Sequence, residues 1–183
     1  MIFMKKWKIS FLLLLCCSFL VSCNIDAQEQ EMPDIVFVYK SVFDYRSEYE
    51  VWFIDKSGNI YFSTEREVVG GQHQERIDKY VAGELSDKIS HVGTVEISEL
   101  KKNYNLLREV ADNDEFKVVF DGTGVNAERP LQRWYGIYYN SNGELEQLMF
   151  LKKDSGTYTP NDSKASEIAN WMNSLMESTK PKE

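Results

Sequence analysis

The stretch QRWYGIYY (132–139), followed by NSNG (140–143) and ELEQLMFL (144–151), determines the predicted fold more than any other part of the sequence. Both flanks are rich in aromatic and branched apolar residues, which is typical of β-strands. The Asn and Gly residues between them readily adopt the backbone angles of a tight turn. The stretch therefore predicts a β-hairpin of two antiparallel strands.

The same type of pattern occurs near the start of the chain. DIVFVYKSVF (34–43), EYEVWFI (48–54) and NIYFS (59–63) predict three strands, the last two joined by a turn that contains Gly58. FKVVF (116–120) adds a third strand to the hairpin described above. The sequence thus predicts two groups of three strands.

Three segments have apolar residues at helical spacing: 72–85, a segment that starts at Ser98, and 163–176. Between the first two, 86–97 is ambiguous and is compatible with a short extended piece. Because the strands are clustered, we expect an α+β domain: an antiparallel sheet from two three-strand groups with about three helices packed on one face. Duplication of one half is left open.

The N-terminus has the pattern of a secretory signal peptide. Three lysines precede an apolar run of thirteen residues (9–21), which is shorter than the roughly 20 residues of a membrane-spanning helix. The next residues, Leu20-Val21-Ser22-Cys23, resemble the lipobox of bacterial lipoproteins. That resemblance implies that residues 1–22 are removed and that Cys23 carries diacylglycerol. The protein would then be lipid-anchored to a cell membrane or outer membrane, on its extracytoplasmic side.

The chain after residue 22 divides into three parts in this interpretation. Residues 23–33 form the lipidated cysteine and a flexible polar tether, 34–178 a single α+β domain, and 179–183 a disordered tail. Removal of residues 1–22 takes away three lysines and no acid, so the formal charge changes from −8 to −11. Such a charge argues against nucleic acid as a partner. The lipid on Cys23 is then the expected membrane contact.

No catalytic residue, metal site or cofactor is expected from the sequence. Ser98-Glu99-Leu100-Lys101 fits the S-x-x-K motif of penicillin-recognising serine enzymes, but the S-D-N and K-T-G elements of that family are missing. His73 and His91, the two histidines, do not have the spacing of zinc ligands. A helix cap and solvated side chains explain these residues better than a catalytic or metal site does.

The candidate binding residues come from a long connection and the strand that follows it. Residues 122–130 include Asn126 and Arg129, which is suited to clamp a carboxylate. Strand alternation places Trp134 and Tyr138 on one face of the sheet and Tyr135 on the other. Exposed aromatic rings favour sugar or protein contacts. The alternative is that a core on both sides of the sheet buries these rings.

We therefore expect a lipid-anchored cell-envelope protein that acts as a non-enzymatic binding module for a protein, peptide or glycan. Two alternatives remain open. One is a cell-envelope hydrolase whose site combines scattered carboxylates with a histidine. The other is an assembly or inhibitory lipoprotein that occupies a groove of its partner.

Overall fold

The computed structural model describes residues 31–43, 48–69, 73–120, 130–153 and 157–181. Met32–Glu183 forms one compact unit. The predicted signal peptide (1–22), Cys23 and the predicted tether up to residue 30 lie outside the described residues.

The described chain contains both strands and helices, and the predicted α+β class is confirmed. The strands are β1 (Ile35–Phe43), β2 (Glu48–Asp55), β3 (Asn59–Ser63), β4 (Ser90–Thr94), β5 (Val118–Phe120), β6 (Leu131–Tyr139), β7 (Leu145–Lys153) and β8 (Thr157–Pro160). The helices are α2 (Arg66–Val69), α3 (His73–Val81), α4 (Ile97–Ala111) and α5 (Ser163–Thr179).

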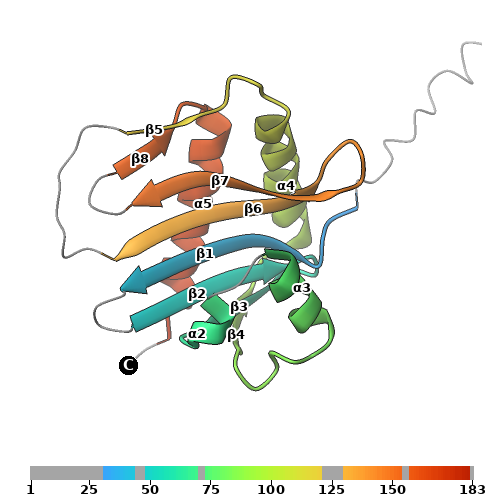
Figure 1. The fold of residues 1–183 in the computed structure, drawn as a ribbon, viewed down its shortest axis with the longest axis vertical. Coiled ribbons are helices and arrows are strands. Elements are labelled where there is room, and N and C mark those ends of the chain that lie inside the picture. The colour runs from blue at the N-terminus through green and yellow to red at the C-terminus, as the bar shows by residue number, and fades with distance from the viewer. Residues whose placement is uncertain (1–30, 44–47, 70–72, 121–129, 154–156, 182–183) are drawn as a thin grey trace, which may run out of the picture. The chain divides into compact units, whose positions relative to one another are not determined.

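The strands form one antiparallel sheet in the order β4-β3-β2-β1-β6-β7-β8-β5 (Figure 1). The two predicted strand groups meet where β1 pairs with β6, and Val38 lies opposite Tyr135 there. From this central pair, β2 and β3 follow on one side and β7 and β8 on the other. The ambiguous segment supplies β4, while β5 is not beside β6 but at the outer edge.

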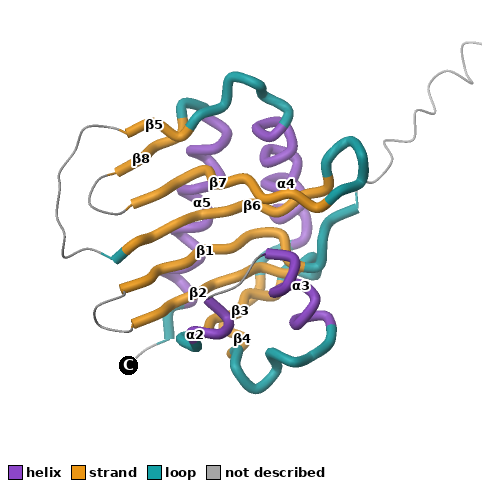
Figure 2. Tube along the Cα trace, viewed as in Figure 1, coloured by secondary structure: helices purple, strands orange, loops and turns teal. Residues whose placement is uncertain are grey.

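One face of the sheet, called the back face here, is covered by α4 and α5 (Figures 1 and 2). Asp162 caps the start of α5, because its side chain accepts hydrogen bonds from the backbone N–H groups of Lys164 and Ala165. The core beneath these helices includes Phe37, Trp52, Tyr104, Leu107, Trp134, Phe150, Ile168 and Met172.

The opposite, front face carries a second and smaller core, which α2 and α3 partly cover. The helix expected over 72–85 thus packs as α3 on the front, whereas the other two expected helices lie on the back. Alternation explains the division, because β1 and β2 present large apolar residues to both faces. The hydroxyl of Tyr80 in α3 donates to Asp55 Oδ2 at 2.7 Å and joins the helix to the end of β2.

Gly136, in β6, is required by the close packing of α4 on the back face. A methyl group at this position would overlap the side chain of Leu107, which is fully buried. We predict that Gly136→Ala lowers the free energy of unfolding by about 1–3 kcal/mol, since the core is overpacked there. Chemical denaturation measures this. In a Leu107→Ala background the same substitution should cost much less, and an equal cost in both backgrounds would contradict the packing explanation.

Candidate functional site

The front of β6 and β7 is the part of the sheet with the most unusual side chains. The ribbons of α2 and α3 lie toward β1, β2 and β3 (Figure 2), while Ile77 of α3 shares the front core with Ile137 of β6. Every second side chain of β6 points to this side, namely those of Arg133, Tyr135 and Ile137.

Three basic residues lie side by side across neighbouring strands on the front face. Lys40 in β1 pairs with Arg133 in β6, and Arg133 pairs with Lys152 in β7. Side chains that are directly opposite in antiparallel strands have Cβ atoms about 4.5–5.5 Å apart, and like charges in such positions are destabilising. The row therefore concentrates positive charge in a chain whose net charge is −8.

Arg76 of α3 brings a fourth cation to the row. Its side chain is only 4% exposed, and its Nε donates to the backbone oxygen of Val68 at 2.9 Å. Burial lowers the pKa of Arg76 to about 10, although Tyr135 and Glu75 act in the opposite direction. We call Lys40, Arg76, Arg133 and Lys152 the cationic cluster.

Lys40 is the most perturbed member of the cationic cluster. Burial, together with the positive charges of Arg76 and Arg133, lowers the pKa of its amine to about 7. The amine therefore titrates near neutral pH, far below the usual range of lysine. When it is protonated, Lys40 is a partly buried cation close to the guanidinium groups of Arg76 and Arg133.

Arg133 has bonding capacity that the described residues do not fill. Its Nε is buried and has no hydrogen-bond partner, and its Nη1 lies 3.5 Å from the hydroxyl oxygen of Tyr135. Within the described part of the chain, no carboxylate forms an ion pair with Lys40 or Arg133. A buried donor without an acceptor is costly, and such groups call for an explanation.

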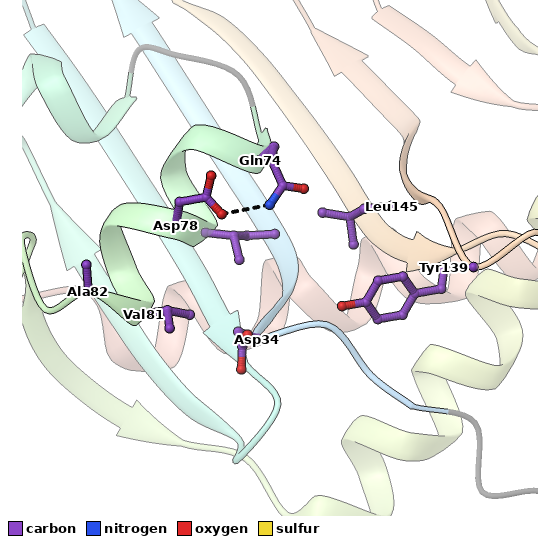
Figure 3. Close-up of a pocket in the computed structure, with 9 residues that line it drawn as sticks. Asp34, Gln74, Asp78, Val81, Ala82, Tyr139 and Leu145 are labelled. Atoms are coloured by element: carbon purple, nitrogen blue, oxygen red, sulfur yellow. Dashed lines mark hydrogen bonds between the residues drawn. The ribbon is translucent and has the colours of Figure 1, made fainter.

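An open hollow of about 580 Å³ lies on the same face, between α3 and the β6–β7 hairpin (Figure 3). Asp78 at its rim accepts a hydrogen bond from Gln74 at 2.7 Å, and Asp34 is paired with Lys56. Its volume is in the range of small-ligand sites. Tyr139 in the hollow and Tyr135 near the cationic cluster belong to the same strand. The lining residues are Asp34, Gln74, Ile77, Asp78, Val81, Ala82, Tyr139, Gly143 and Leu145.

The structure separates the binding residues that the sequence suggested. Trp134 and Tyr138 are 2% and 7% exposed and belong to the core under α4 and α5. The Trp134 Nε1 donates to Asn173 and the Tyr138 hydroxyl donates to Glu146. Tyr135 is on the front face beside Arg133. Asn126 and Arg129 lie outside the described residues.

The cationic cluster was not predicted from the sequence. Lys40 lies between Val38 and Val42 at the alternating positions of a mainly apolar strand, and this was the one available signal. Its pairing with Arg133 depends on strand register, which a single sequence does not supply.

The residues considered for catalysis or metal binding can be placed where they lie in the described chain. They contain no group of three or more His, Cys, Asp or Glu side chains placed to hold a metal ion. His91 is exposed and its ring lies edge-on to Tyr61, at 5.7 Å between centroids. Ser98 and Lys101 of the S-x-x-K motif are both exposed on the first turns of α4. This placement suits a solvated helix surface.

Comparisons with known proteins leave the family open. No family model, no curated protein and no solved structure matches the chain at a significant level. In the part of the chain that the structure describes, no helix is both long and apolar enough to span a bilayer.

The depressed pKa of Lys40 leads to a prediction about stability. The folded state binds fewer protons than the unfolded state between pH 7 and the usual range of lysine, so the charge penalty is full below pH 7 and disappears as pH rises through that interval. Lys40→Met should raise the free energy of unfolding by about 1–2 kcal/mol at pH 6, with a smaller gain at pH 10.

Urea denaturation at both pH values measures the effect, and Lys101→Met on the exposed surface of α4 is the matched control. The control should change stability by less than about 0.5 kcal/mol. A loss of stability for Lys40→Met at pH 6 would show that the amine is well solvated.

Proposed function

We propose that this protein is a lipid-anchored, non-enzymatic binding module of the cell envelope, and that the front face of its sheet is the binding surface. The observation that carries the proposal is that, among the described residues, no carboxylate forms an ion pair with Lys40 or Arg133, and the buried Nε of Arg133 has no acceptor. Charges that reduce stability without an internal partner are typical of binding sites, because function and stability compete there.

The surroundings of the cationic cluster support the same proposal. Tyr135 provides an amphipathic ring beside Arg133, and Arg and Tyr are the residue types most often found at the energetic centres of interfaces. The cluster and the hollow lie along the same strand, because Tyr135 is next to Arg133 and Tyr139 lines the hollow. A protein, peptide or glycan that reaches both would be held at two places. An assembly or inhibitory lipoprotein would use the same surface.

The hydrolase alternative is less well supported by the described residues. The hollow is lined by Asp34 and Asp78, but no histidine is among its lining residues. Asp34 is engaged by Lys56 at 2.7 Å, and Asp78 accepts from Gln74. A general base would have to be free to reach a proton on the substrate.

The anchor is tested separately from the binding surface. We predict that the protein isolated from a bacterium with the lipoprotein pathway lacks residues 1–22 and carries diacylglycerol on Cys23. Cys23→Ser should retain residues 1–22, because the cysteine is the substrate of lipidation. Intact-mass analysis distinguishes the two products. An unmodified thiol on a processed, secreted chain would contradict the anchor.

The binding surface is tested by the position of crosslinks in the full-length protein within intact cells. A photoreactive residue in place of Gln147, which lies opposite Ile137 on the front of β7, should give a discrete adduct. The same residue in place of Asn105, exposed on α4, is the matched control and should give none. Equal adducts at both positions, or adducts at Asn105 alone, would place the partner elsewhere.

A further inference from the structure

We propose that the cationic cluster is the binding site for a tetrahedral dianion, such as the phosphate group of a phosphorylated ligand. This deepens the proposed function, on which it rests, by assigning a chemical class to the group that the front face recognises.

The charge of the cluster matches a dianion better than a single carboxylate. When Lys40 is protonated, Lys40 and Arg133 carry two positive charges that no carboxylate of the described residues neutralises. Arg76 and Lys152 extend the positive potential on either side, one from α3 and one from β7. A monoanion would leave one of the two central charges without compensation.

The donors are also suited to tetrahedral oxygens. A guanidinium presents N–H groups in a planar fork that binds two oxygens of one phosphate, whereas an ammonium binds as a point charge. Arg133 has a buried Nε without an acceptor, and Lys40 stands directly opposite on the neighbouring strand. The hydroxyl of Tyr135, next to Arg133 Nη1, offers a further donor.

The site is held by rigid elements. Lys40 and Arg133 are in the two central strands, and Arg76 is fixed by its hydrogen bond to Val68. The cations are therefore already assembled before a ligand arrives, and little ordering cost remains for binding.

The direct test is a titration of the full-length protein, purified in a neutral detergent, with inorganic phosphate and with sulfate. Isothermal calorimetry gives the affinity, and NMR of labelled lysine amines shows whether Lys40 responds. Arg133→Gln keeps a polar side chain but removes the charge and the fork, and should weaken binding at least tenfold. Lys101→Gln, on exposed α4, is the matched control and should bind as the wild type does.

The pH dependence of sulfate binding provides a second readout. Sulfate keeps its charge between pH 6 and 8, so a change in affinity reports on the protein. The charged groups that act on Lys40 are Arg76 on α3 and Arg133 on β6. Tyr135 and Glu75 act in turn on Arg76, and Lys152 of β7 pairs with Arg133. Burial and the two guanidinium groups lower the pKa of Lys40 to about 7.

Affinity for sulfate should therefore fall about tenfold from pH 6 to 8. Lys40→Met should bind more weakly and lose most of this dependence. Measurements in a His73→Asn/His91→Asn background, which removes the two histidines, should show the same fall.

Two further experiments show whether the dianion belongs to a lipid or to a soluble ligand. They also separate a failure of the dianion site from a failure of the binding function. Vesicles with phosphatidic acid, compared with neutral phosphatidylcholine vesicles, test a lipid headgroup, and glycerol phosphate tests a soluble ligand. Absence of sulfate and phosphate binding, or binding unchanged by Arg133→Gln, would overturn the dianion site. If the crosslink at position 147 still forms, the binding function stands and only its ligand class is wrong.

Discussion

The pairing of β1 with β6 is the constraint on which the rest of the structure depends. These strands join the two strand groups, and their register runs without interruption from Phe37 opposite Gly136 to Val42 opposite Leu131. Register fixes which residues share a face of the sheet. A slip of one residue would exchange the faces of β6, so that Arg133 would enter the core beneath α5 and Trp134 would leave it. The back core and the front cluster are thus consequences of one pairing.

The two faces of the sheet also differ in how far helices cover them. The back face is closed by two long helices over a large apolar core, whereas the front face is closed only in part by α2 and α3. Because the back core supplies most of the apolar burial, the front face is free to include side chains that the fold does not need. Lys40 and Arg133 lie opposite each other on that face, an arrangement that opposes folding.

The sequence predicted the elements with strong periodicity and missed those without it. The hairpin around residues 140–143 and the stripe of α5 are visible as patterns, and the α+β class follows from them. By contrast, β4 (SHVGT) lacks clear alternation and β8 (TYTP) is short and ends in proline, so their pairing with β3 and β7 decides that they are strands. The cationic cluster was beyond prediction for a similar reason, because it exists only through contacts between segments far apart in sequence.

Lys40 shows how the site and the fold compete. Its neighbours on the front face of β1, Val38 and Val42, are apolar, and an apolar residue in its place would suit the front core better. The cation is held instead in a place where burial and two guanidinium groups disfavour its charge. A bound anion removes this conflict, because it supplies the negative charge that no described carboxylate provides to Lys40 and Arg133. In a protein whose remaining surface is acidic, the cluster is also a place where an anion meets attraction rather than repulsion. An anionic ligand is thus directed to the front face, because the positive charge is concentrated there while the protein as a whole is negatively charged.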